Sequence, residues 1–227
     1  MNKIFIITLF PDLFPGPLGV SIFHKSFQKH WDMEIVDLRK FGVGKHKNVD
    51  DTVFSGLPGM LIRPDVVEAA LDSIKSDNAL NARKIFLSPR GKKLKQANVE
   101  EMVLDYEKRD LVILCGRYEG VDQRAIDHLG FEEWSIGDYV IAGGESASFI
   151  LLESIIRKIP GVIGNKGAFE NETFTNNEIS EPRYTKPAVW NTLDGKSIEV
   201  DCVLRSGNHK EIELFQKAQR KCIVNDD

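Results

Sequence analysis

The chain has 227 residues, of which 42% are hydrophobic and 28% charged, a balance typical of a folded globular protein and not of a disordered or fibrous one. Its formal net charge of -4 excludes binding to nucleic acid through overall positive charge, so any RNA contact has to come from local patches. No segment approaches the ~20 apolar residues of a membrane-spanning helix, and the apolar run at residues 4–10 is too short for a signal peptide. Three widely spaced cysteines without a CxxC pair favour a reducing compartment, so we expect a cytoplasmic protein with no membrane partner.

Short apolar runs alternate with helical patterns through the first half of the chain. Such alternation predicts an α/β domain with a mainly parallel sheet and helices on both faces. The long segment between the second strand and the second helix has glycines, charges and little periodicity, which indicates a loop that is either functional or disordered. The predicted strands are residues 4–9, 35–38 and 84–87, the predicted helices are residues 21–29, 64–73 and 98–107, and the predicted loop is 39–59.

Residues 111–145 organise the chain. The apolar run 111–115 predicts a strand buried on both faces, and it ends at Gly116. Two glycine-bearing loops follow, GRYEGVD and SIGDYVIAGGE, before a helical pattern at residues 146–158. A third loop, Ser88-Pro89-Arg90-Gly91, follows the strand at 84–87. Ligands of open α/β sheets bind beyond the carboxyl ends of the strands, so these three loops predict a small-molecule site.

The loops limit the chemistry of that ligand. They contain neither GxxxxGK[ST] nor a GxGxxG that opens a helix, which disfavours a polyphosphate nucleotide. Backbone-rich loops with Tyr118, Tyr139 and Glu119 suit a heteroaromatic ring, hydroxyl groups and a positive centre, and S-adenosylmethionine has all three. The residues alone leave this ligand open, because each glycine can equally serve a tight turn. Cys115 ends a buried strand, where a packed thiol is expected in preference to a nucleophile.

The C-terminal third differs in composition. Prolines and glycines in IPGVIGNKG end the preceding helical pattern, and the following segment is rich in Asn, Glu and Thr, as in a linker that orders on binding. Residues 188–227 are too few for an independent core, so this small part, mostly helical and with a helix at 212–221, is expected to pack on another surface such as a partner subunit. We expect a domain at 1–160, a flexible linker at 161–187 and a small helical domain at 188–227.

Basic side chains gather in three places. Each group is either a solvated face or an RNA contact, and its position in or beside a loop favours RNA contact. The groups are Lys45, His46 and Lys47; Arg90, Lys92, Lys93 and Lys95; and Arg183 with Lys186.

Long motifs of this chain resemble one family. CGRYEGVD together with EEWSIGDYVIAGGE resembles the signature of the bacterial tRNA (guanine-N1)-methyltransferases, which belong to the SPOUT class of knotted methyltransferases. Further motifs are similar in the same order, so that the resemblance covers nearly the whole chain: TLFPDLF, KHKNVDDTVF, PGM, LSPRGKKL, IPGV, EPRYTKP and LRSGNHKEI.

The resemblance implies an activity and an assembly. The expected reaction transfers a methyl group from S-adenosylmethionine to N1 of the guanosine immediately 3′ of a tRNA anticodon. The expected enzyme is a homodimer with its active site at the subunit interface, and magnesium assists the family's reaction. The resemblance also implies a trefoil knot formed by the segments around residues 85–145, whereas ordinary connection rules would predict an unknotted sheet.

Roles for individual residues follow from the same resemblance. Glu172 matches the family's aspartate base, with Glu170 as the alternative, and Arg157 matches an arginine that steadies the developing charge on the guanine oxygen. Without the resemblance, Arg157 would be a cation at a helix C-terminus and both glutamates would be solvated acids. No protein metal site is expected. The residues expected to hold the methyl donor are Phe86, Leu87, Ser88, Pro89, Gly116, Tyr118, Glu119, Ser135, Ile136, Gly137, Asp138, Tyr139, Val140, Ile141, Gly143 and Gly144.

The chain departs from the family pattern at several positions. Ser55 and Leu57 stand where relatives typically carry glycines, and Asn208 replaces one of two frequent histidines, so no histidine base is assigned. These departures leave two alternatives open. One is an RNA-binding protein of the same fold with weak or no catalysis, and the other is an enzyme that methylates a different RNA.

Overall fold

The computed structural model describes residues 1–54, 56, 58–75, 81–164, 166–169, 172–174 and 177–223. Ser55, Leu57 and Glu170 therefore lie outside the described residues. The chain forms two compact units, Met1–Gly164 and Asn165–Asp227. Within the part of the chain that is described, no helix is both long enough and apolar enough to cross a membrane.

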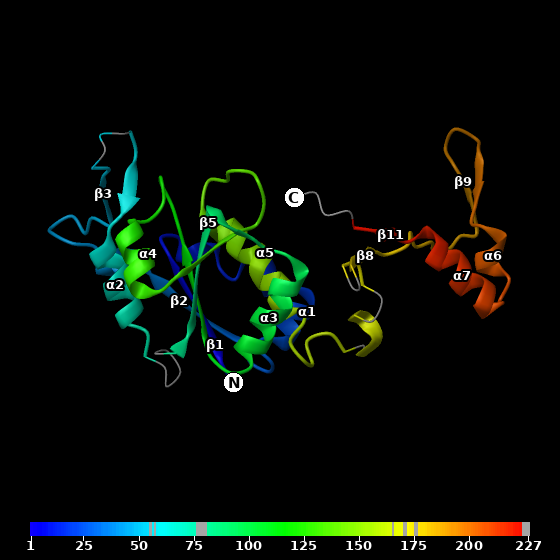
Figure 1. Cartoon of the computed structure of the whole chain (residues 1–227), viewed down its shortest axis with the longest axis horizontal. Coiled ribbons are helices and arrows are strands. Elements are labelled where there is room, and N and C mark those ends of the chain that lie inside the picture. The colour runs from blue at the N-terminus through cyan, green and yellow to red at the C-terminus, as the bar shows by residue number, and fades with distance from the viewer. Residues whose placement is uncertain are drawn as a thin grey trace. The chain divides into compact units, whose positions relative to one another are not determined.

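A five-stranded sheet runs through the first unit in the order β2-β1-β6-β5-β7, and every neighbouring pair is parallel (Figure 1). Alternate residues of β1 enter two different cores: Ile4 and Ile6 one, Phe5 and Ile7 the other. Burial on both faces is typical of a parallel sheet covered by helices. The strands are β1 (Lys3–Thr8), β2 (Asp32–Asp37), β5 (Arg83–Lys93), β6 (Leu111–Cys115) and β7 (Glu132–Ser135).

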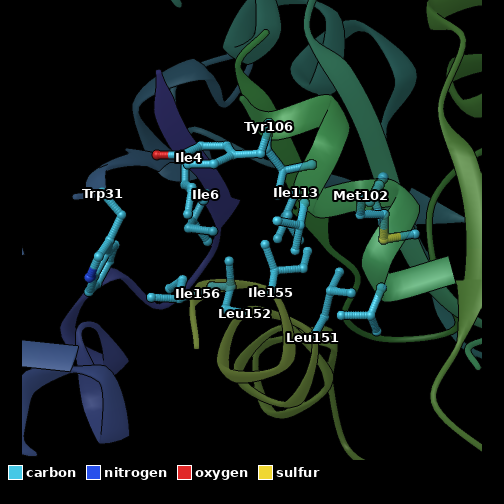
Figure 2. Packing of buried hydrophobic residues seen from close by; sticks show 14 of the residues in the cluster. Ile4, Ile6, Trp31, Met102, Tyr106, Ile113, Leu151, Leu152, Ile155 and Ile156 are labelled. Atoms are coloured by element: carbon cyan, nitrogen blue, oxygen red, sulfur yellow. The ribbon is translucent and has the colours of Figure 1, made fainter. Parts of the chain in front are cut away.

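Helices α1 (Ser21–Ser26), α3 (Gln96–Tyr106) and α5 (Gly144–Ile156) supply the core on one face of the sheet. Figure 2 shows the α5 side chains pointing at the strands, with Leu152 and Ile155 beneath the isoleucines of β1 and β6. Both α5 side chains are fully buried. Helix α5 is therefore fixed to the sheet by a continuous apolar contact.

The other face of the sheet is covered by α2 (Pro64–Asp72) and α4 (Gln123–Leu129), which lie together in Figure 1. Asp122 caps α4 by accepting from the backbone N–H of Arg124 at 2.9 Å, and Gly130 ends it with a φ of 71°. The predicted α/β architecture, a parallel sheet with helices on both faces, is confirmed.

Several elements differ from the sequence prediction. The predicted loop 39–59 contains most of the 3-10 helix η3 (Leu38–Phe41) and the strand β3 (Asp50–Thr52), which pairs antiparallel with β4 (Met60–Ile62). β3 is polar and only three residues long, so it has no apolar alternation to reveal it. Strand β5 continues through Ser88 to Gly91, predicted as a loop, because it pairs with β7 again after a register shift. Helix α4 and strand β7 were not predicted, since both are short and carry charges.

A buried guanidinium lies where β5 begins, at the end of the sheet opposite its carboxyl edge. The side chain of Arg83 is only 5% exposed, and it donates to Glu132 at 2.7 Å and to Asp105 at 2.8 Å. Asp105 also accepts from Arg109 at 2.7 Å, so its carboxylate has two cationic donors. These ion pairs compensate the desolvation of Arg83.

The second unit combines hairpins with helices. The 3-10 helix η5 (Lys166–Phe169) is followed by β8 (Glu178–Ile179), which pairs antiparallel with β11 (Lys221–Cys222). Beyond β8, the antiparallel pair β9 (Val189–Asn191) and β10 (Ser197–Glu199) precedes α6 (Cys202–Arg205) and α7 (His209–Gln219). A hairpin thus lies in the segment expected to be mostly helical. The sequence did not predict it, because its strands have only three residues each and carry no long apolar run.

We predict that the three cysteines differ in reactivity. Cys115, at the end of β6, is fully buried, and burial raises the pKa of its thiol, whereas Cys202 and Cys222 are exposed. Two thiols should react rapidly with Ellman's reagent in the native protein, and the third only after denaturation. Rapid modification of all three without unfolding would contradict the packing of β6.

Candidate active site

A cavity of about 350 Å³ lies at the carboxyl edge of the sheet, beyond the ends of β5, β6 and β7. Its size is within the ~300–1,000 Å³ of small-molecule sites. The walls are formed by Phe86, Leu87, Ser88, Pro89, Arg90, Gly116, Arg117, Tyr118, Glu119, Gly120, Val121, Gln123, Glu133, Trp134, Ser135, Ile136, Gly137, Tyr139, Val140, Ile141, Ala142, Gly143, Gly144 and Ala147.

All residues that the sequence assigned to the methyl donor line this cavity, except Asp138. The carboxylate of Asp138 instead pairs with the ammonium group of Lys93. Sequence reasoning did not assign Trp134 or Ala147 to the donor site, and it placed Arg90 in the third loop without a role in donor binding. Ala147 lies one turn inside a helix and carries no chemical signal, so only the fold reveals its contribution.

The loop after β6 is a tight turn in which the N–H of Gly120 donates to the carbonyl of Arg117 at 3.0 Å. Tyr118 has a positive φ of 60°, and this residue is 52% exposed where it lines the cavity. The N–H of Glu119 donates to the carbonyl of Met60 at 3.0 Å, so β4 supports this loop from outside.

The loop after β7 is held by the side chain of Ser135, which bonds to the loop backbone. The hydroxyl of Ser135 accepts from the N–H of Gly137 at 3.2 Å and donates to the carbonyl of Gly137 at 3.0 Å. Gly137 has a φ of 154°, and a Cβ there would lie 2.5 Å from the ring of Tyr139. The ring therefore packs directly on the glycine backbone.

Glycine backbones bring these two loops into contact. The N–H of Gly144 donates to the carbonyl of Gly116 at 2.8 Å. A Cβ on Gly144 would lie 2.8 Å from the Gly116 nitrogen and 2.9 Å from Cys115 Cα, positions that only movement of β6 could relieve. A Cβ on Gly143 would lie 2.2 Å from Nε of Arg117. Close packing, as well as turn geometry, explains these glycines.

The third wall follows β5. Arg90 donates to the amide oxygen of Gln123 at 3.2 Å, and the Gln123 amide group donates to Glu133 at 3.1 Å. The ammonium group of Lys92 lies 5.2 Å from the ring centroid of Trp134, a cation–π distance. A polar chain thus connects the third wall to α4 and β7.

Comparison with known proteins places this chain in a family. The family model described as tRNA (guanine-1)-methyltransferase TrmD matches residues 2–225. The chain belongs to the tRNA (guanine-1)-methyltransferase family.

Relatives of this family member align along almost their whole length. A tRNA (guanine-N(1)-)-methyltransferase of Ehrlichia canis is 41% identical over 221 residues, which cover 96% of this chain and 90% of that protein. Proteins of the same name from Ruegeria pomeroyi and Rhodospirillum rubrum are 43% and 44% identical, and each alignment covers 96% of this chain and 87% of the relative.

The two residues assigned to catalysis in this tRNA (guanine-1)-methyltransferase family member belong to different units. Arg157 is half-buried and caps the end of α5 in the first unit, where its N–H donates to the carbonyl of Glu153 at 3.2 Å. Glu172 is half-buried in the second unit. The structure therefore gathers all but one of the residues assigned to the methyl donor in one cavity, whereas the residue assigned as base belongs to the other unit.

Nucleophiles and metal donors are the remaining chemical candidates. The thiol of Cys115 lies behind the cavity wall and is fully buried, so it is not placed to attack a ligand. Among the residues that the structure describes, no group of three or more His, Cys, Asp or Glu side chains could hold a metal ion. The cavity provides backbone groups, aromatic rings and carboxylates, which suit binding and orientation.

We predict that Gly144→Ala disrupts the cavity. The added methyl group would meet the backbone of β6, which cannot rotate away, so the free energy of unfolding should fall by about 1–3 kcal/mol. Binding of a methyl donor should weaken in parallel. Gly164→Ala is the matched control, because no atom of another described residue, apart from its chain neighbours, lies within 4 Å of its added Cβ, and its stability should stay within about 0.5 kcal/mol of wild type. Denaturant titration and calorimetry measure both effects.

Proposed function

We propose that this protein transfers a methyl group from S-adenosylmethionine to N1 of the guanosine immediately 3′ of a tRNA anticodon. The observation that carries the proposal is that the three glycine-bearing motifs typical of the family form one cavity at the carboxyl edge of the sheet. A chain that had kept only RNA binding would have no need for that cavity.

The cavity fits the methyl donor in its chemistry. Tyr118, Tyr139 and Trp134 offer faces for a heteroaromatic ring, glycine backbones allow close approach to hydroxyl groups, and Glu119 offers a negative charge to a positive centre. S-adenosylmethionine supplies the methyl group from a sulfonium centre. The residues assigned to it in the proposal are the lining residues of the three loops, with Asp138 beside them as the ion-pair partner of Lys93.

Glu172 is the proposed base. Its carboxylate takes the proton of guanine N1 while the new bond between N1 and the methyl carbon forms, and the electrons of the broken carbon–sulfur bond remain on sulfur. Arg157 is proposed to balance the negative charge that develops on the guanine oxygen. Magnesium, which the family resemblance also implies, has no donor cluster among the described residues and is assigned no step.

A homodimer is part of the proposal. Large apolar side chains near the N-terminus and on α5 are exposed, which is typical of a surface that meets another subunit: Leu13 at 46%, Val20 at 61%, Ile22 at 37% and Ile150 at 48%. The α5 helix contacts the 3-10 helix η2 (Gly16–Gly19), which precedes Val20 and Ile22. We propose a second copy as the occupant, with the active site at the subunit interface.

The proposal extends to topology and domain roles. It assigns a trefoil knot to the segments around residues 85–145, which contain β5, β6 and β7 and all three cavity walls. Residues 1–160 act as the knotted donor-binding domain, residues 161–187 as a linker that carries the base, and residues 188–227 as a small C-terminal domain. The three widely spaced cysteines form no CxxC pair, which favours a reducing compartment and supports a cytoplasmic location.

Substrate recognition is proposed to combine tRNA shape with an extruded base. Lys45, His46 and Lys47 are exposed on a turn, where they are accessible to a phosphate backbone. Among the second group, Lys92 and Lys93 already contact Trp134 and Asp138, so their charges are partly engaged near the cavity. Arg183 and Lys186 are exposed in the second unit.

A methyl-transfer assay tests the function. Radiolabelled S-adenosylmethionine is incubated with unmodified tRNA transcripts that carry either guanosine or adenosine immediately 3′ of the anticodon. We expect incorporation only into the guanosine transcript. Equal labelling of both transcripts would indicate a different target, and background labelling of both with intact tRNA binding would indicate an RNA-binding protein without efficient catalysis.

We predict that Glu172→Gln lowers kcat by about 100-fold or more, because the amide cannot accept the N1 proton. Affinity for tRNA and for the methyl donor should stay close to wild type, as single-turnover kinetics and calorimetry would show. Glu170→Gln is the matched control and should keep nearly full activity. Full activity of Glu172→Gln, with loss in Glu170→Gln, would move the base to position 170.

A further inference from the structure

A buried carboxylate lies directly behind the wall of the cavity. Glu145, in the first turn of α5, has no solvent exposure, and burying a carboxylate without partners is costly. Its Oε1 accepts from the hydroxyl of Thr8 at 2.7 Å, and its Oε2 accepts from Nε of Arg117 at 2.7 Å. Each oxygen of the carboxylate is therefore held by a different part of the chain.

The hydroxyl group of Thr8 donates its hydrogen to Glu145. Its oxygen accepts from the backbone N–H of Phe10 at 2.9 Å, which leaves the hydroxyl hydrogen for Glu145. Strand β1 ends at Thr8, so this bond connects the carboxylate to the middle of the sheet. The first turn of α5 and the end of β1 are thereby fixed relative to each other.

Arg117 extends the interaction to both glycine loops. It belongs to the loop after β6, and one of its terminal nitrogens donates to the carbonyl of Ala142, in the loop before α5, at 3.2 Å. Its guanidinium carbon also lies 4.4 Å from the ring centroid of Phe10, a cation–π contact. One side chain thus bridges two walls of the cavity.

The backbone is shaped to admit this side chain. A Cβ at Gly143 would lie 2.2 Å from Nε of Arg117 and 2.4 Å from its guanidinium carbon, so the guanidinium crosses the second loop in direct contact with its backbone. Beside this contact, the N–H of Gly144 donates to the carbonyl of Gly116. The ion pair and the backbone bond together fix the spacing of the two loops.

We infer that Glu145 is a positioning residue for the methyl donor: by holding Arg117, it sets the spacing of the loop after β6 and the loop before α5 before the donor binds. Arg117 lines the cavity, whereas Glu145 lies behind it and acts through Arg117. The inference rests on the proposed function, because it assigns the donor to this cavity. A preformed site loses less conformational freedom on binding than a loose one, which is how the ion pair raises affinity.

The test replaces the charge and keeps the shape. Glu145→Gln in the full-length protein keeps the size of the side chain but removes its negative charge, so the hydrogen bond from Arg117 is no longer an ion pair. We expect the Kd for S-adenosylmethionine, measured by calorimetry, to rise roughly tenfold. In kinetics, KM for the donor should rise while kcat at saturating donor stays within about twofold, a split that indicates lost binding energy shared equally by the ground state and the transition state.

Asp105→Asn is the matched control. Asp105 likewise accepts from two arginines, Arg83 and Arg109, but it lies on α3 near the opposite end of the sheet. Its variant should lose stability and keep the wild-type Kd for the donor. In addition, Arg117→Lys combined with Glu145→Gln should weaken donor binding no more than the stronger single variant, because both remove the same interaction. A general loss of stability would not produce that coupling.

The outcomes separate the inference from the function on which it rests. If wild type binds the donor and methylates tRNA while Glu145→Gln has an unchanged Kd, the inference is overturned and the proposed function stands. If wild type neither binds the donor nor methylates tRNA, the proposed function fails and the inference fails with it. Should Glu145→Gln not fold, Thr8→Val removes one donor at similar size, and it should raise the Kd by roughly threefold. An unchanged Kd in Thr8→Val would then overturn the inference.

Discussion

Burial of the central strands on both faces is the constraint on which the rest of the structure depends. Strands β1 and β6 send alternate side chains into two apolar cores, so neither strand has a face left for a ligand. Five parallel strands also place all their carboxyl ends at one edge, where the backbone leaves the sheet. That edge is where the loops after β5, β6 and β7 meet, and it is where the cavity lies.

Close packing at this edge explains why the loops are rich in glycine. The helix α5 lies on one face of the sheet and its first turn approaches the end of β6 so closely that a Cβ on Gly144 would reach the backbone of Cys115. The same approach brings a buried carboxylate, Glu145, within 2.7 Å of both Thr8 and Arg117. Apolar packing of α5 therefore positions the charged contacts, and the charged contacts hold the loops that apolar packing cannot reach.

The sequence predicted those parts of the fold whose signal is local. The strand β6 was predicted with its observed bounds, because five consecutive apolar residues lie between Asp110 and Gly116. The extension of β5 through Pro89 was missed, since its pairing with β7 restarts after a register shift that no periodicity records. Helix α4 has only seven residues and β7 only four, too few for a reliable period. Contiguous family motifs contain most of the cavity residues, Trp134 among them, whereas the contribution of Ala147 depends on how the elements pack.

Glu145 shows why part of the site could not be predicted. In the sequence it is one acidic residue after two glycines, with no sign that it is buried, because its partner Thr8 is 137 residues away. The fold supplies that partner by placing β1 beside β6, and the ion pair with Arg117 then follows from the loop geometry. The loops on either side of the cavity meet through the backbones of Gly116 and Gly144, which have no side chains to keep the contact rigid. The rigidity has to come from behind the wall, and a fully buried carboxylate with two donors is a physically sufficient source, because moving either loop would leave that charge without its partner.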